Sequence, residues 1–156
     1  MENAEQIEYW NGEAGKRWAQ DDDTMARLLQ PVSQALLDHA APAGCKHALD
    51  VGCGGGSQSL MLAQRLGEGS RVLGVDISAP MLEVARRKAQ APAGSRASLD
   101  FLQADAASHP FAAGDFDLLV KFYLDDDSDV GHFMNEKVQS IPGIRDTYTI
   151  ITYRAF

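Results

Sequence analysis

The sequence predicts a doubly wound α/β fold: three layers, with helices packed on a mostly parallel sheet of about five strands. Two observations predict it. Short apolar runs of strand length alternate with segments of helical periodicity through the middle of the chain. A glycine cluster also separates the first apolar run from the helix that follows it. Crossovers between parallel strands are right-handed, so we expect right-handed connections here.

Five strands are predicted from the apolar runs. The first run, HALDVGC, is β-branched and aliphatic, and it ends at three consecutive glycines, as a buried parallel strand does. The last run, TYTIITYRAF, is rich in β-branched and aromatic residues. The predicted strands cover residues 47–53, 71–76, 98–103, 116–124 and 147–156.

Helices are predicted between these strands and before them. The apolar residues of these segments recur at helical spacing, and cap or stop residues flank them. A further amphipathic segment is indicated near Trp10 and Trp18. The predicted helices cover residues 31–40, opened by Pro31; 57–66, capped by Ser57; 79–90, capped by Ser78; and 128–141, ended by Pro142 and Gly143.

Composition excludes several classes of function. The chain has 156 residues, with 22 acidic and 14 basic side chains and a net charge of -8, so a nucleic-acid binder that works through a basic face is excluded. The length suits a single domain. No apolar run approaches the roughly 20 residues that cross a bilayer, and the N-terminus is acidic where a signal peptide is basic. We therefore expect a cytoplasmic protein without membrane contact.

No metal site is expected. The two cysteines, Cys45 and Cys53, have no partner pair with zinc-ligand spacing, and the histidines show no i, i+4 pairing. The acidic runs at residues 21–23 and 125–127 are interpreted as solvated residues that complement helix dipoles. Cys53 is expected to be a small packing residue.

The most informative stretch is LDVGCGGGS, residues 49–57, a glycine-rich turn between a strand and a helix. Glycine permits positive φ there and brings a ligand close to main-chain amides at a helix N-terminus. Asp76 closes the second strand and Asp105 the third, so the three strand ends meet at one edge of a parallel sheet. Asp76 can accept hydrogen bonds from a ribose diol, and Asp105 from an exocyclic amine.

The turn has two other interpretations. A glycine turn that holds no ligand is the simpler one. A dinucleotide-binding loop would need a third glycine at the position of Ser57, which weakens a nicotinamide or flavin site.

Residues from about 7 to 119 resemble a class I S-adenosylmethionine-dependent methyltransferase, of the small-molecule type related to the ubiquinone and menaquinone methyltransferases. The resemblance is carried by LDVGCGGGS, VLGVDISAPML, FLQADAASHPF and FDLLV. It implies a Rossmann-like fold and a small-molecule ligand, S-adenosylmethionine or S-adenosylhomocysteine.

The resemblance also implies where the cofactor binds. Gly52, Gly54 and Gly56 would lie near the methionine moiety, Asp76 on the ribose hydroxyls, Ile77 against the adenine face and Asp105 at the adenine amine. Asp50 and Ala106 complete the predicted cofactor-binding set. The N-terminal segment around Trp10 and Trp18 would fold over the cofactor as a lid, although simple core packing is the alternative for both tryptophans.

From about Asp117 onward the sequence instead resembles the C-terminal end of the ligand-sensing domain of the leucine-responsive regulatory protein and AsnC family. The residues that carry it are Phe133, Ile141, Pro142, Gly143, Ile144, Thr147 and Thr149. It implies a ferredoxin-like βαβ fragment that completes the sheet, and a seam within residues 117–120. The predicted organisation is one domain, 1–156, with a methyltransferase-like segment 1–119 and a regulator-derived segment 120–156.

A chimera, engineered, selected from a library or naturally fused, follows from these two resemblances. Helix 128–141 would cover one face of the sheet, and strand 147–156 would lie beside the fourth strand. A ferredoxin-type pairing would instead leave a gap that another chain could fill, and the exposed terminal strand predicts self-association.

Three functions stay open at this point. The chain is a cofactor-binding fragment with little or no catalysis, an active small-molecule methyltransferase, or a structural association module without a ligand. His109, Lys121 and Tyr123 are the candidate bases or nucleophiles near the expected crevice, and none has a partner that the sequence identifies, so the catalytic residues are unknown.

Overall fold

The computed structural model describes residues 4–90, 97–111 and 116–117. The chain divides into two compact units, Met1–Phe122 and Tyr123–Phe156, and all the described residues belong to the first. The predicted helix 128–141, the predicted strand 147–156 and most of the predicted strand 116–124 lie outside the described residues.

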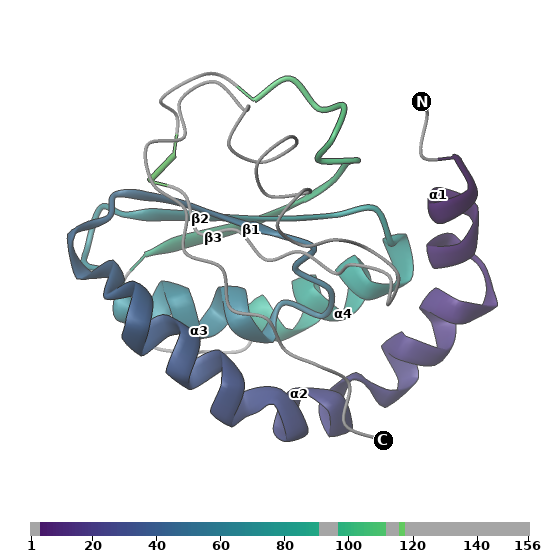
Figure 1. Ribbon diagram of the computed structural model, residues 1–156, viewed down its shortest axis with the longest axis horizontal. Coiled ribbons are helices and arrows are strands. Elements are labelled where there is room, and N and C mark those ends of the chain that lie inside the picture. The colour runs from purple at the N-terminus through teal and green to yellow at the C-terminus, as the bar shows by residue number, and fades with distance from the viewer. Residues whose placement is uncertain (1–3, 91–96, 112–115, 118–156) are drawn as a thin grey trace. The chain divides into compact units, whose positions relative to one another are not determined.

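Three parallel strands form the sheet of this unit (Figure 1). They are β1 (His47–Val51), β2 (Arg71–Asp76) and β3 (Ser98–Gln103), in the order β1-β2-β3. His47 is paired with Arg71, and Arg71 with Ser98, so the strands run in step and end at the same edge. The parallel pairing is confirmed, as are the predicted bounds of β2 and β3, whereas β1 ends two residues earlier than predicted.

Helices flank the strands in chain order. They are α1 (Ala4–Asn11), α2 (Glu13–Ala40), the short 3-10 helix η1 (Pro42–Gly44), α3 (Ser57–Arg65) and α4 (Ala79–Ala89). Figure 1 shows α2, α3 and α4 on the same side of the sheet. The two crossover helices therefore cover one face, because consecutive strands are neighbours in the sheet.

The core lies between the sheet and these helices. Leu37 of α2, Leu62 of α3 and Val72 of β2 are fully buried and belong to one cluster. Burying such side chains stabilises the fold by roughly 1.5–3 kcal/mol each. Because Leu37 lies near the end of α2, the cluster holds that end of the long helix against the sheet.

Helix α2 corrects the prediction that Pro31 opens a helix. The helix begins at Glu13 and continues through Pro31 for 28 residues. A proline inside a helix removes one main-chain hydrogen bond, but tertiary contacts hold α2 on both sides of it. Asp22 is buried before Pro31, and Leu37 after it.

One predicted cap is confirmed and one is wrong. The Ser78 side chain accepts a hydrogen bond from the Met81 amide at 3.4 Å, as expected of an N-cap. Ser57, in contrast, is the first residue of α3, and Gly56 is its N-cap with a φ of 76°. The turn needs a left-handed residue at the cap, and glycine adopts that conformation without strain.

Asp117 lies beside β1 on the edge away from β2. Lys46 O accepts from the Arg71 amide at 2.7 Å, and His47 O accepts from the Asp117 amide at 2.6 Å. Successive carbonyls of a strand point to opposite sides, so Asp117 occupies the other side of β1. One residue of the predicted fourth strand, Asp117, is thus placed at this edge.

We expect Asp117 to make stability depend on pH. Hydrogen bonds from the amides of Lys46 and His47 lower the pKa of its carboxyl group. The folded pKa is below the unfolded one, near 3.9, so the contribution is present above that pH and is lost as the pH falls through the folded pKa. Urea unfolding should show Asp117→Ala less stable than wild type at pH 7, with the difference shrinking as the pH falls below the unfolded pKa.

The control is Asp100→Ala, which removes an exposed carboxylate from β3. Equal losses for both variants at every pH would contradict the assignment.

A glycine series should separate backbone conformation from crowding. A Cβ on Gly56 would lie 2.8 Å from Ala85 Cβ and from Phe101 Cζ, at a positive φ. Gly69 has a positive φ in open space, and Gly67 has open space without a positive φ. We expect alanine to cost about 2–4 kcal/mol at Gly56, about 1 at Gly69 and under about 0.5 at Gly67 in urea unfolding. Equal costs at Gly56 and Gly69 would show that crowding is unimportant. Equal costs at Gly69 and Gly67 would show that the positive φ is unimportant.

Candidate functional site at the carboxyl edge of the sheet

The glycine loop closes over the end of β2. The amides of Gly52 and Cys53 both donate to Val75 O, at 2.8 and 3.1 Å. Gly52, Gly54 and Gly56 have positive φ values of 71°, 52° and 76°. The predicted left-handed turn is confirmed, and it directs the loop toward the residue that follows Val75.

That residue, Asp76, has its carboxylate fixed by two main-chain amides. Oδ2 accepts from Gly54 N and Oδ1 from Ser78 N, each at 2.8 Å. The side chain is half-buried. Each carboxylate oxygen has a second lone pair, so the group can still accept hydrogen bonds from a ligand.

Asp105 lies at the same edge, after β3. The Ala104 amide donates to Asp76 O at 3.0 Å, which ties the two strand ends together. The Asp105 carboxylate accepts from the Ala107 amide at 3.0 Å, and both it and Ala106 are half-buried. The predicted meeting of Gly54, Asp76 and Asp105 at one edge is therefore what the structure shows.

Asp50 lies beneath the loop. It is 1% exposed, and its Oδ2 accepts from Ser59 Oγ of α3 at 2.6 Å. Its side chain therefore joins β1 to α3 under the glycine turn, although the sequence grouped it with the residues that contact the cofactor.

The loop is also shaped by packing against α2 and α4. A Cβ on Gly54 would lie 3.3 Å from Met81 Cε, and one on Gly55 would overlap the Asp22 carboxylate. Gly56 likewise faces Ala85. Glycine is required at Gly55 and Gly56 by these internal neighbours, so the requirement there comes from the protein itself.

Asp22 and Lys88 were missed by the sequence reasoning. The sequence predicts a solvated run at residues 21–23, but Asp22 is 7% exposed and forms an ion pair with Lys88. Lys88 Nζ also donates to Ser57 Oγ at 2.9 Å. Helical spacing alone gave a signal: Asp22 follows Gly15 and Trp18 by seven and four residues, on the side of α2 that faces α4.

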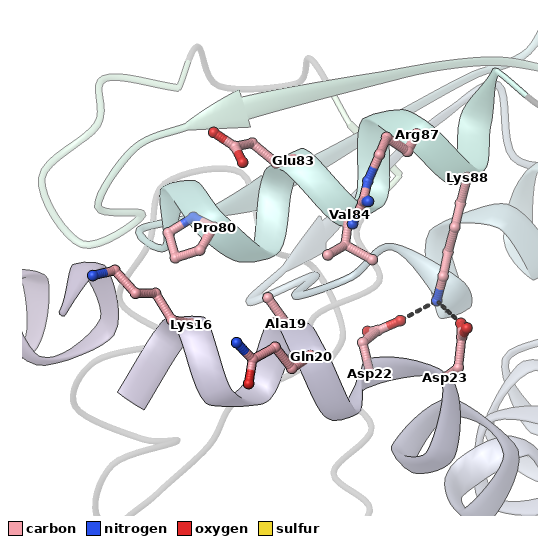
Figure 2. Close-up of a pocket in the computed structure, with 10 residues that line it drawn as sticks. All are labelled: Lys16, Ala19, Gln20, Asp22, Asp23, Pro80, Glu83, Val84, Arg87 and Lys88. Carbon is pink, nitrogen blue, oxygen red and sulfur yellow. Dashed lines mark hydrogen bonds and ion pairs between the residues drawn. The ribbon is translucent and has the colours of Figure 1, made fainter. Parts of the chain in front are cut away.

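A groove of about 690 Å³ runs between α2 and α4 beside this ion pair (Figure 2). Figure 2 shows Lys88 reaching from α4 to Asp22 and Asp23, with Lys16 and Glu83 further along the groove. Its lining mixes both charges and includes none of the residues predicted to bind a cofactor.

The N-terminal segment lies next to the turn after β2. Ser78 Oγ donates to Trp10 O at 2.8 Å, and the Trp10 and Trp18 rings make an edge contact with centroids 6.1 Å apart. Both tryptophans are half-buried. The predicted proximity of this segment to the site is confirmed, whereas its action as a lid stays a prediction.

The remaining candidates give no catalytic pair. The His109 ring packs edge-on against Phe111 at 4.6 Å, and Lys121 and Tyr123 lie outside the described residues.

Two effects raise the pKa of the Cys45 thiol: burial, which is the larger, and the negative charge of Asp117. Within residues 4–90, 97–111 and 116–117, no three potential metal-ligating side chains gather, and no helix is both long and apolar enough to cross a membrane.

Parallel strands whose carboxyl ends meet at one edge beside a glycine turn define a Rossmann-like class of α/β protein. Comparison with known families identifies the member of this class. Residues 48–141, more than half of the chain, match the family described as methyltransferase domain. The chain belongs to this family.

Several methyltransferases of known function are similar in sequence. The demethylmenaquinone methyltransferase of Thermus thermophilus is 42% identical over 81 residues, which are 52% of this chain and 35% of that protein. The release factor glutamine methyltransferase of Chlorobaculum tepidum is 39% identical over 129 residues, covering 73% and 42%. The nocamycin O-methyltransferase of Saccharothrix syringae is 35% identical over 98 residues, covering 63% and 34%. The chain thus spans less than half the length of these relatives.

Solved structures share the fold. Magnesium protoporphyrin IX methyltransferase from Synechocystis, with bound S-adenosylmethionine, has a TM-score of 0.51 and 28% identity over 69% of this chain and 56% of that one. Its S-adenosylhomocysteine complex has a TM-score of 0.52 and 26% identity, covering 69% and 53%. The Rossmann-like character of the predicted fold is confirmed by these neighbours.

A double-mutant cycle should measure the coupling of Asp22 to Lys88. Either single variant, Asp22→Asn or Lys88→Met, removes one charge of a largely buried pair and should cost about 2 kcal/mol of unfolding free energy. The double variant should cost less than the sum, because no charge is left unpaired. Urea unfolding gives these values, with Asp21→Asn on the exposed side of α2 as the control. Strict additivity would contradict the coupling.

Proposed function

We propose that the carboxyl edge of β1, β2 and β3 binds S-adenosylmethionine, with Asp76 accepting hydrogen bonds from the two ribose hydroxyls. The main support for this proposal is the position of the Asp76 carboxylate beside the glycine loop. Its two oxygens accept hydrogen bonds from the amides of Gly54 and Ser78, each at 2.8 Å. A fixed acceptor with free lone pairs suits a vicinal diol. The bound cofactor supplies an activated methyl group on its sulfonium.

The other residues have roles that follow from their places. Asp105, after β3, would accept from the adenine amine, with Ala106 beside it, and Ile77, after Asp76, would lie against the adenine face. The loop from Gly52 to Gly56 would lie along the methionine moiety.

Charge supports the proposal. S-adenosylmethionine carries a sulfonium, an ammonium and a carboxylate, and therefore a net positive charge. Asp76 and Asp105 place two carboxylates at the edge, and opposite charges within a partly buried site attract more strongly than in bulk water. Neighbouring structures with this cofactor or its demethylated product bound support the same ligand.

The acceptor that we propose is a small molecule. Relatives named for demethylmenaquinone and nocamycin methylation support this class. His109 is the described candidate for a base near the edge, where its ring packs against Phe111.

The finer hypothesis is a chimera with little or no catalysis. The resemblance of residues 117–156 to the AsnC family supports a seam at residues 117–120, and the family match that continues to residue 141 argues against one. The helix and the last strand of the regulator-derived segment lie outside the described residues. Self-association through that strand stays a prediction. A ligand-free association module is the remaining alternative.

Titration calorimetry with S-adenosylhomocysteine tests the proposed site. Wild type should release or absorb binding heat, and ligand at about 100 times its dissociation constant should add about 2.7 kcal/mol to the unfolding free energy. Asp76→Ala should weaken binding by at least about tenfold, because it removes a charged acceptor. Asp100→Ala should bind like wild type. No heat and no change in melting temperature with wild type would leave the association module as the better hypothesis.

Methyl transfer distinguishes the two ligand-binding alternatives. Labelled S-adenosylmethionine should be incubated with a panel of hydroquinones and phenols, with Asp76→Ala as the negative control. Transfer that Asp76→Ala abolishes would identify an active enzyme, and binding without transfer would support the fragment with little catalysis.

A further inference from the structure

One residue of the N-terminal segment forms hydrogen bonds with the turn that follows β2. This turn, residues 76–79, contains the proposed ribose acceptor and the residue proposed to face adenine. Asn11 ends α1, and its Nδ2 donates to Ile77 O at 2.8 Å. Its Oδ1 accepts from the Ala79 amide at 2.9 Å. One side chain thus binds the main chain on both sides of Ser78.

The Asn11 amide is used fully. Its Nδ2 also donates to Ile7 O at 2.7 Å, within α1. Gln103, at the end of β3, donates from Nε2 to Asn11 Oδ1 at 3.3 Å and to Ile77 O at 3.2 Å. These hydrogen bonds connect α1, the turn after β2 and the end of β3, three segments that are distant in sequence. We name Asn11, Ile77, Ala79 and Gln103 the turn clamp.

Close packing keeps the N-terminal segment on this turn. Ser78 Oγ donates to Trp10 O at 2.8 Å. A Cβ on Gly15 would overlap Trp10 O and would lie 2.9 Å from Ser78 Oγ. Only a residue without a side chain allows α2 to approach here, so the fit of residues 10–15 to the turn is specific.

We propose that Asn11 is a positioning residue for the adenosine part of the site, and that it couples the docking of α1 to cofactor binding. The inference rests on the proposed function. Asp76 Oδ1 is oriented by the Ser78 amide, which lies between the two main-chain groups that Asn11 binds. Movement of this turn would therefore move the ribose acceptor. Since coupling between sites is reciprocal, bound ligand should also hold α1 more firmly.

Affinity for S-adenosylhomocysteine measures the first half of the proposal. Asn11→Ala should weaken binding by about tenfold, a typical coupling. Asn11→Asp keeps an acceptor for the Ala79 amide but sets a carboxylate oxygen against Ile7 O and Ile77 O, so it should weaken binding at least as much as Asn11→Ala. Gln103→Ala, at an exposed position, should lose about threefold, since it removes one weaker pair of hydrogen bonds.

The matched control is Gln6→Ala. Gln6 is also on α1 and accepts a hydrogen bond from Trp10 Nε1 at 3.2 Å on the exposed side of the helix. It does not belong to the turn clamp, so its affinity should stay within about twofold of wild type. An equal loss for Gln6→Ala and Asn11→Ala would mean that α1 stability alone decides binding, which would overturn the role of Asn11.

Hydrogen exchange of the α1 amides measures the reciprocal half. S-adenosylhomocysteine should slow exchange in wild type and in Gln6→Ala, and should slow it much less in Asn11→Ala. Unchanged affinity together with normal slowing in folded Asn11→Ala would overturn the proposal. If Asn11→Ala does not fold, wild-type affinity of both Asn11→Asp and Gln103→Ala would overturn it, and graded losses would support it. Failure of wild type to bind, in contrast, would overturn the proposed function itself.

Discussion

The in-step ending of three parallel strands is the constraint on which the rest of the structure depends. Because β1, β2 and β3 are paired without stagger, the segments that follow them reach one edge together. The glycine loop can then bond to Val75 O, and Ala104 to Asp76 O. A shift of β2 by two residues along its neighbours would separate Asp76 from Gly54, and the candidate site would no longer exist.

Asp76 connects two systems that hold the site from different sides. Its Oδ2 bonds to the glycine loop, which α2 and α4 support through Asp22 and Met81. Its Oδ1 bonds to the turn that Asn11 holds. The N-terminal helices therefore act on both halves of the site, α2 through the loop and α1 through the turn. These two helices also pack on the crossover helices α3 and α4, so they contribute both to the core and to the site.

Local sequence patterns predicted what depends on neighbours along the chain. The bounds of β2 and β3, the cap at Ser78 and the left-handed glycines each follow from residue type and short-range spacing. Helical spacing groups Asp22 with Gly15 and Trp18 on one side of α2, but its ion pair with Lys88 and the course of α2 through Pro31 could not be predicted, because the partners lie far away in sequence. Asn11 was missed for the same reason, since its partners at Ile77 and Ala79 are 66 and 68 residues away.

The packing of the loop bears on where ligand specificity resides. Gly55 and Gly56 are required by Asp22, Ala85 and Phe101, so a glycine-rich turn would be retained in this fold whatever the ligand. The loop alone is therefore weak evidence for any particular cofactor. Discrimination between ligands has to come from side chains that the packing of the core does not require. The half-buried carboxylates of Asp76 and Asp105 meet this condition, and as hydrogen-bond acceptors they suit the ribose hydroxyls and the adenine amine of a nucleoside.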